Sequence, residues 1–351
     1  MITNTILADL GWTADFMRQL DLTEVGTTDP ARVTGVHRNR IETLSAAGPQ
    51  DLIPASDLNT GDVAVGDWVL ARGPVALRVL DRRTELQRKA AGTGVARQLI
   101  AANVDTALIV SSCNHDFNIG RLERYLVLCA SAGIEPVLVL TKADTCPDPA
   151  AYVAQAQTMQ RGLAVVALNA HAGQVRQELA EWCRKGRTLV LLGSSGVGKT
   201  TLSNALTGGS AAVQDIREDD AKGRHTTTAR SLVAMAEGGW LIDTPGVREL
   251  QLTDVADGIE ALFDDLTDLA LTCRFSDCQH EVEPGCAVQA AIAAGDLDPD
   301  RLQRWYKLKR EDRFNSQTIH QAHLRARTFG KMHRKIGDKR NPGGRPPGGR
   351  K

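Results

Sequence analysis

One stretch of eight residues restricts the fold of this chain more than any other feature. Residues 193–200 read Gly-Ser-Ser-Gly-Val-Gly-Lys-Thr and fit the pattern G-x-x-x-x-G-K-[ST] without a mismatch. The apolar run 188–192 precedes them and predicts a buried strand, and residues 202–206 begin like a helix. A strand, a glycine-rich loop and a helix in this order are the context of a phosphate-binding loop. The chain is therefore predicted to bind a nucleoside triphosphate.

The residue types of the loop indicate how it holds phosphate. Glycines let the backbone curl until successive N–H groups point at phosphate oxygens, and the helix N-terminus adds its dipole. Lys199 adds a positive charge, and the hydroxyl of Thr200 is expected to ligate Mg²⁺. The residues predicted to bind the nucleotide here are Gly193, Ser194, Ser195, Gly196, Val197, Gly198, Lys199, Thr200 and Thr201.

Two later segments complete the predicted phosphate site. Asp243-Thr244-Pro245-Gly246 ends an apolar strand and has the D-x-x-G pattern of P-loop GTPases. In that pattern Asp243 holds Mg²⁺ through water, and the N–H group of Gly246 senses the γ-phosphate. The polar stretch 223–228 lies between the two motifs and suits a switch loop, so one of its threonines is expected to complete the Mg²⁺ shell.

A third motif predicts which base is bound. Thr141-Lys142-Ala143-Asp144 follows an apolar strand and resembles the N-K-x-D motif that reads guanine. The carboxylate of Asp144 would accept from the ring N1–H and the exocyclic amine, a pair of donors that adenine lacks. Lys142 would lay its aliphatic stem over the base. Thr141 replaces the usual asparagine, which is expected to remove one side-chain amide tie to neighbouring loops.

The order of these motifs is permuted. Ordinary GTPases run from phosphate loop to switch, D-x-x-G and N-K-x-D, whereas here the base-reading motif comes first. Strands alternate with helices around the motifs, which predicts a parallel sheet covered on both faces. Such a sheet can be joined and recut elsewhere because chain termini often lie close together. Asn169-Ala170, after another apolar strand, is a further candidate loop for base contact.

Four metal-binding side chains cluster near the C-terminus. Cys273, Cys278, His280 and Cys286 offer three thiolates and one imidazole within fourteen residues. Zn²⁺ takes four such ligands tetrahedrally, and a site filled by protein ligands is structural. Reduced cysteines in a loop are the alternative, but the polar neighbours of these residues do not suit buried thiols. We predict a structural zinc site that holds a small helical module together.

Different sequence patterns divide the chain into three expected domains. Residues 31–89 alternate short β-prone runs with turns, which predicts a barrel of the oligonucleotide-binding type, although an SH3-like barrel has nearly the same pattern. We expect an N-terminal arm and barrel at 1–90 and a circularly permuted α/β P-loop GTPase domain at 91–252. Residues 253–351 would form an α-helical zinc-binding domain with a basic tail.

Charge is unevenly distributed along a chain whose formal net charge is zero. Residues 301–351 hold 16 Lys and Arg against 3 Asp and Glu, and residues 1–300 carry the opposite excess. A basic tail on an acidic body predicts contact with a polyanion, and a disordered solubilising tail is the alternative. Basic residues also recur in the predicted barrel: Arg32, Arg38, Arg40, Arg78, Arg82, Arg83, Arg88 and Lys89.

Composition favours a soluble cytoplasmic protein. Its content of 42% hydrophobic and 24% charged residues is ordinary for a globular chain. No apolar run approaches the roughly 20 residues of a membrane span, and the N-terminus lacks the features of a secretory signal. Seven cysteines are an odd number for a disulfide framework, and the cytoplasm would keep them reduced.

Together these motifs resemble a known family. The permuted series T-K-A-D, G-S-S-G-V-G-K-T, G-R-H-T-T-T, D-T-P-G and C-R-F-S-D-C-Q-H-E-V-E-P-G-C is similar to that of the ribosome small-subunit-dependent GTPase A family. The resemblance implies an oligonucleotide-binding barrel, a GTPase core that takes GTP with Mg²⁺, and a zinc-binding C-terminal domain. It also implies GTP hydrolysis in late maturation of the small (30S) ribosomal subunit, contacts with its rRNA, and low turnover that the subunit stimulates. We further expect other assembly factors as partners and a monomeric chain.

The group that orients the catalytic water is less plain from the sequence. Val247 follows D-x-x-G where Ras-like enzymes often have glutamine, and its side chain cannot hydrogen-bond to water. Our hypothesis is that His225 acts instead, as is suspected for the matching histidine of the family; an exposed loop histidine is the alternative. Two other functions stay open: an RNA-binding module that the nucleotide merely stabilises, and use of ATP.

Overall fold

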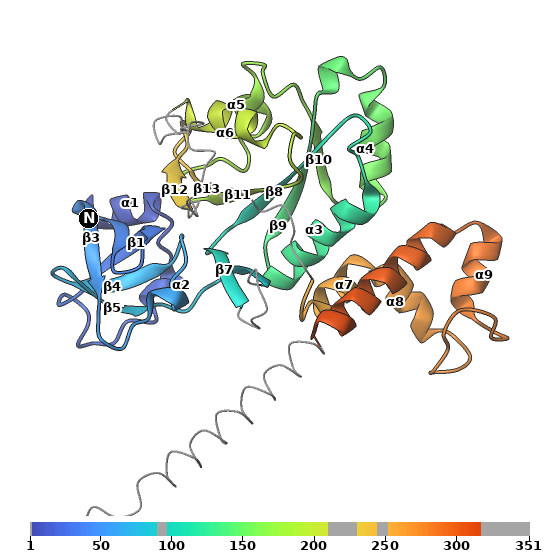
Figure 1. Cartoon of the computed structure of the whole chain (residues 1–351), viewed down its shortest axis with the longest axis horizontal. Coiled ribbons are helices and arrows are strands. Elements are labelled where there is room, and N and C mark those ends of the chain that lie inside the picture. Colours follow the sequence, from blue (N-terminus) through green and yellow to red (C-terminus); the bar gives the residue numbers. More distant parts are fainter. Residues whose placement is uncertain (1, 90–96, 210–229, 244–251, 317–351) are drawn as a thin grey trace, which may run out of the picture.

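The computed structural model describes residues 2–89, 97–209, 230–243 and 252–316 (Figure 1). A barrel, an α/β sheet with its helices, and a C-terminal group of helices follow one another along the chain. In Figure 1 the barrel (blue) and the C-terminal helices (orange) lie on opposite sides of the α/β part. The part of the basic tail after residue 316 lies outside the described residues.

Five strands close into the N-terminal barrel: β1 (Asp29–Val36), β2 (Ile41–Ser45), β3 (Gly48–Pro54), β4 (Trp68–Arg72) and β5 (Val75–Val79). Their order is β1-β2-β3-β5-β4, with β4 antiparallel to β1 and β5 parallel to β3. This order is that of the oligonucleotide-binding barrel, so the prediction is confirmed over the SH3-like alternative. Val33, Ile41 and Leu52 point inward and are fully buried.

Several elements of the N-terminal part go beyond the sequence prediction. Strand β3 has a proline near each end, and the hairpin β6 (Glu85–Lys89) and β7 (Arg97–Ala102) leads from the barrel to the sheet. The predicted arm contains the short helices α1 (Ile2–Asp9) and α2 (Ala14–Met17), and the 3-10 turn η1 (Thr60–Asp62) precedes β4. Residues of the arm pack on Trp68 of the barrel, so the arm is part of the fold.

A buried arginine joins the arm, the barrel and the sheet. Arg32 on β1 is 1% exposed, and its guanidinium donates to the carbonyls of Leu10 (2.5 Å) and Gly66 (3.0 Å). It also donates to the hydroxyl of Thr188 at 2.9 Å and lies over the Trp68 ring. Burial lowers the pKa of Arg32 to about 10, so the side chain stays charged at neutral pH. Arg32 therefore fixes the position of the barrel on the α/β part.

The central sheet confirms the predicted α/β domain. Its strands β8 (Thr106–Ser112), β9 (Glu135–Thr141), β10 (Ala164–Ala167), β11 (Thr188–Leu192), β12 (Ser231–Ala234) and β13 (Trp240–Asp243) run in the order β10-β9-β8-β11-β13-β12. All neighbours are parallel except β12, which pairs with β13 in an antiparallel hairpin.

Helices α3 (Ile119–Ala132), α4 (Pro149–Gln157), α5 (Val175–Glu178) and α6 (Lys199–Thr207) connect the strands. Successive residues of β8 belong to different hydrophobic clusters, with Leu108 in one and Ile109 in the other. Both faces of the sheet are therefore covered, as the continuous apolar runs predict.

The C-terminal part is helical, as predicted. It contains α7 (Ala256–Leu262), α8 (Asp264–Leu271), α9 (Ala287–Ala294) and a helix over residues 299–316. Helix α7 packs on α3 so closely that a Cβ atom at Gly258 would lie 2.4 Å from the carbonyl oxygen of Val127. In the part of the chain that the structure describes, no helix is both long and apolar enough to cross a membrane.

A buried carboxylate attaches the C-terminal helices to the sheet domain. Glu123 on α3 is fully buried and accepts from Arg304 Nε at 2.9 Å, with Arg301 3.7 Å away. Arg301 also pairs with Asp265 of α8 at 2.7 Å. Burial raises the pKa of Glu123, and the two arginines oppose that effect. Because an unpaired buried charge is costly, this network favours a single docking position for the helices.

Candidate nucleotide site and metal centre

The parallel sheet brings the predicted nucleotide motifs to one edge. Strand β11 ends at Leu192 just before the phosphate loop, β9 ends at Thr141, and β13 ends at Asp243. Because all three strands are parallel, their carboxyl ends meet at the same edge. Ligands of open α/β sheets bind at this edge. Permutation of the chain thus leaves the three motifs together in space.

Glycine is needed for the shape of the phosphate loop. Gly193, Gly196 and Gly198 have φ angles of 140°, 80° and 96°, which side chains rarely tolerate. A Cβ atom at Gly193 would lie 2.3 Å from the carbonyl oxygen of Val110 on β8. Val197, the apolar residue of the loop itself, is fully buried. The loop therefore has the curled backbone that the sequence predicts.

Lys199 lies over the loop as the first residue of α6. Its ammonium donates to the carbonyl of Gly193 at 2.8 Å and to that of Ser194. Thr200 and Thr201 form the next positions of the same helical turn. A positive charge beside a helix N-terminus makes this a place for an anion.

The base-reading motif is attached to the phosphate loop through Thr141. Its hydroxyl is 2.6 Å from the carbonyl oxygen of Val197 and 3.0 Å from that of Ser111. Threonine lacks the side-chain amide of the usual asparagine, but its hydroxyl still ties this motif to the phosphate loop. Thr141 is 1% exposed, so the bond is shielded from water. The two loops lie side by side here, since an ideal Cβ atom at Gly198 would lie 3.5 Å from the hydroxyl oxygen of Thr141.

The rest of this motif turns outward from the sheet edge. Lys142 adopts the left-handed conformation with φ 60°, and the 3-10 turn η2 (Ala143–Thr145) follows it. The N–H group of Ala143 donates to the carbonyl of Leu168 at 3.3 Å, which holds the turn against the loop after β10. Asp144 is exposed and therefore accessible to a ligand. The candidate loop at Asn169 thus lies beside the motif.

The remaining predicted residues of this site are described only in part. Asp243 is the last described residue of β13 and is exposed at the sheet edge. Gly246 and His225, and the threonines near His225, lie outside the described residues. Their expected roles stay predictions.

We expect Thr141→Ala to weaken guanine-nucleotide binding about tenfold, because it removes the buried hydrogen bond between the two ligand-binding loops. Thr141→Ser keeps the hydroxyl and is the matched control, with an expected affinity near wild type. Titration with a fluorescent GDP analogue measures both. An alanine variant that binds as tightly as the serine variant would show that the bond does not position the loops.

The predicted metal ligands converge in the C-terminal part. The ligand atoms of Cys273, Cys278, His280 and Cys286 all lie within 4.8 Å of one another. The Cys273 and Cys286 sulfurs are 3.9 Å apart, and each is 3.5 Å from His280 Nδ1. A tetrahedral zinc site with ordinary bond lengths has edges of roughly 3.8 Å between sulfurs and roughly 3.6 Å from sulfur to nitrogen. The cluster therefore fits a four-coordinate structural metal.

Local structure orients these ligands. His280 has φ 56°, and its carbonyl accepts from the Gln289 side chain at 2.6 Å. Cys286 caps the start of α9, where its sulfur accepts from the N–H group of Gln289 at 3.4 Å. Burial lowers the pKa of His280, which favours the neutral imidazole that a metal requires. The metal-binding residues are thus held by backbone that other bonds support.

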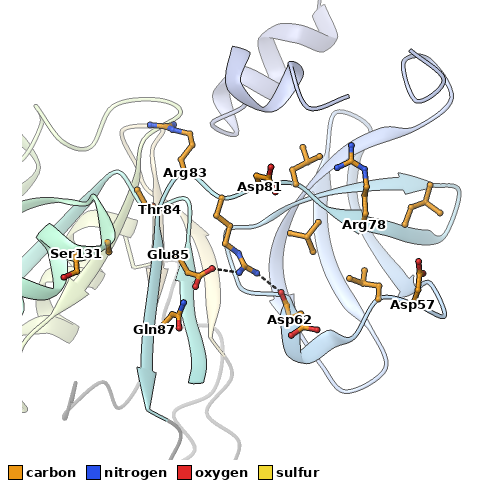
Figure 2. Close-up of a pocket in the computed structure, with 15 residues that line it drawn as sticks. Asp57, Asp62, Arg78, Asp81, Arg83, Thr84, Glu85, Gln87 and Ser131 are labelled. Carbon is orange, nitrogen blue, oxygen red and sulfur yellow. Dashed lines mark hydrogen bonds and ion pairs between the residues drawn. The ribbon is translucent and has the colours of Figure 1, made fainter. Parts of the chain in front are cut away.

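An open groove of about 780 Å³ lies between the barrel and α3, away from the nucleotide motifs (Figure 2). Its arginines already have acidic partners: Arg78 pairs with Glu24 at 2.9 Å, and Arg82 pairs with Asp67 at 2.7 Å. Arg32 is buried in the junction described above. These three basic residues of the barrel hold the fold together, which the sequence count did not reveal.

Comparison with known proteins agrees with this geometry. The family model for the RsgA GTPase matches residues 79–253. The small ribosomal subunit biogenesis GTPase RsgA of Mesorhizobium japonicum is 54% identical over 316 residues, which cover 88% of this chain and 91% of the relative. Small ribosomal subunit biogenesis GTPase RsgA 2 of Vibrio parahaemolyticus is 46% identical over 96% of this chain and 95% of its own length.

Two solved structures share the fold. YjeQ from Thermotoga maritima superposes with a TM-score of 0.60 at 24% identity and covers 80% of this chain and 97% of its own. YloQ, described as a circularly permuted GTPase, gives 0.59 at 23% identity, over 83% of this chain and 97% of its own. The permuted order read from the sequence is confirmed, and so is GTP hydrolysis as the activity. This chain belongs to the RsgA GTPase family.

Proposed function

We propose that this chain hydrolyses GTP in late maturation of the small ribosomal subunit and that the subunit stimulates its turnover. One structural observation carries the proposal: at the sheet edge, Thr141 joins a guanine-type motif to the phosphate loop. The names of the two relatives above, which match nearly the whole chain, support the same role.

Each nucleotide contact is part of this proposal. The phosphate loop and Lys199 would hold the phosphates, Thr200 and Asp243 would hold Mg²⁺, and Asp144 would read guanine. Mg²⁺ would neutralise the negative charge that develops on the phosphates during hydrolysis. Zinc in the cysteine and histidine cluster would hold the C-terminal module together. The proposed domain boundaries are 1–90, 91–252 and 253–351. The family match begins at residue 79 and therefore runs across the first boundary.

The proposed partners are the small subunit with its rRNA and further assembly factors, with the chain acting as a monomer in the cytoplasm. The basic segment after residue 316 would bind rRNA phosphates, and the paired barrel arginines would contribute less. Electrostatic contacts of this kind lose affinity steeply as salt increases.

We expect purified small subunits to raise the rate of GTP hydrolysis by at least about tenfold, as ordering of a catalytic group would do. Phosphate release is measured with and without subunits, and large subunits are the control. A rate that stays unchanged at saturating subunit concentration would instead support an RNA-binding module that the nucleotide only stabilises.

The same assay tests His225. His225→Ala is expected to reduce the stimulated rate about 10²-fold or more, because a positioned catalytic group contributes on that scale. Affinity for GTP should stay unchanged. Full stimulated turnover in the variant would show that another group orients the water.

A further inference from the structure

Two hydrogen bonds fix the backbone on either side of the histidine of the metal centre. The hydroxyl of Tyr306, on the helix over residues 299–316, donates to the carbonyl of Gln279. The side-chain amide of Gln289, on α9, donates to the carbonyl of His280 at 2.6 Å. The peptide groups before and after His280 are therefore each held by a side chain from a different helix. Neither of these side chains is one of the four predicted metal ligands.

His280 needs such support because of its backbone conformation. Its φ of 56° lies in the left-handed region, which residues other than glycine keep only where the surrounding structure holds them there. Nδ1 of His280 is 3.5 Å from the sulfurs of both Cys273 and Cys286. Rotation of the backbone out of the left-handed region would turn the imidazole away from these sulfurs. The two hydrogen bonds thus keep the imidazole where a tetrahedral metal requires it.

Aromatic packing holds Tyr306 in place independently of its hydroxyl. Trp305 is 5% exposed, and its ring centroid is 5.5 Å from that of Tyr306 and 6.0 Å from that of His280. The three rings therefore pack in a row at the metal centre. Removal of the hydroxyl alone would leave this packing and take away only the bond to the metal loop.

The helix that carries Tyr306 is itself anchored on the sheet domain. Arg304 donates to Glu123 of α3 at 2.9 Å, and Arg301 pairs with Asp265 of α8 at 2.7 Å. In Figure 1 this last described helix runs beside α7 and α8. Tyr306 is only two residues beyond Arg304. Its bond therefore ties the metal loop to a helix whose position is already fixed.

We propose that Tyr306 and Gln289 are positioning residues of the metal centre, whose hydrogen bonds hold His280 in its ligating conformation and so raise the affinity for zinc. The inference rests on the proposed role of the cysteine and histidine cluster as a zinc site. Contacts behind the ligands of a metal commonly change its affinity by about 10- to 100-fold. We expect Tyr306→Phe and Gln289→Met each to weaken zinc binding about tenfold.

Competition with a chromophoric chelator measures zinc affinity on the full-length protein. Tyr306→Phe removes one hydroxyl and keeps the ring beside Trp305. Tyr152→Phe is the matched control, because it removes the same atom from α4, where the ring packs on Phe117 outside the metal centre. We expect the control to bind zinc as wild type does. Equal zinc affinities of the two phenylalanine variants would overturn the proposal.

A double-mutant cycle separates positioning of His280 from a general contribution to folding. His280→Asn removes the imidazole, leaves the three thiolates, and places at this position a residue that tolerates the left-handed conformation. In that background Tyr306→Phe should change zinc affinity by less than about twofold. A loss as large as in the wild-type background would show that Tyr306 does not act through His280, and the proposal would be wrong.

Gln289→Met provides the second test, which decides if His280→Asn holds no measurable zinc. Methionine has a similar length but no N–H group, so it cannot donate to the carbonyl of His280. A tenfold loss of affinity supports the proposal, and an unchanged affinity contradicts it. Failure of the proposed zinc site itself looks different, since the wild-type protein would then bind no stoichiometric zinc.

Discussion

Cys286→Ser is expected to abolish stoichiometric zinc binding and to unfold the region of α8 and α9, while nucleotide affinity stays within about twofold. Serine is a good N-cap, so the variant can keep the bond from the N–H group of Gln289 and lose only the metal ligand. Structural zinc contributes about 10–16 kcal/mol to the folding of small peptides, more than a module of this size can replace. The loss of the fold should therefore be local and nearly complete.

Zinc content per chain and hydrogen exchange over residues 264–295 measure this effect. Cys146→Ser is the matched control, because it exchanges the same atoms outside the metal cluster. Removal of zinc from the wild-type protein by a chelator should reproduce the exchange pattern of Cys286→Ser. A variant that lacks zinc but keeps protected amides in α9 would show that the module folds without the metal.

Lys199→Ala is expected to lower kcat/KM for GTP by about 10³-fold, the upper range for loss of one charged group that stabilises a transition state. The Lys199 ammonium lies beside the loop carbonyls, and no other described lysine or arginine belongs to the segment 193–200. Because α6 begins at this residue and alanine favours helices, the variant should fold normally.

The matched comparison is Asp144→Ala, which changes the base contact and leaves the phosphate contacts alone. Lys199→Ala should reduce binding of GTP and inorganic triphosphate together, whereas Asp144→Ala should reduce only discrimination between guanine and adenine nucleotides. Calorimetry with GTP, ATP and triphosphate distinguishes the two patterns. Tight GTP binding by a protein that carries both substitutions would contradict the assignment of this edge of the sheet.

Local patterns predicted much of the structure. Strand β11 has the predicted bounds, because the apolar run that defines it lies within the element itself. Strand β3 was missed because its prolines and glycine resemble a turn in isolation. Its place in the barrel depends on backbone pairing with β2 and β5, which a short stretch of sequence around β3 does not reveal.

Only the structure shows which arginines are paired and which loops are joined by a hydrogen bond. The sequence showed an excess of arginine in the barrel but not that Arg32 is buried and Arg82 paired with Asp67. It showed threonine in place of asparagine but not that the hydroxyl of Thr141 reaches Val197. Partners separated by dozens of residues are chosen by packing, which a linear pattern does not record.

The sequence alone determined the chemistry available to this protein: a phosphate loop, a guanine-type motif placed before it, and a spacing of cysteines and histidine suited to a metal. Those features depend on residue types at short separations, where backbone geometry leaves few choices. The tertiary structure decided which groups meet, including the hydrogen bond from Thr141 to the phosphate loop and the network around Glu123. Each of these contacts forms only because strands and helices distant in sequence pack together and exclude water.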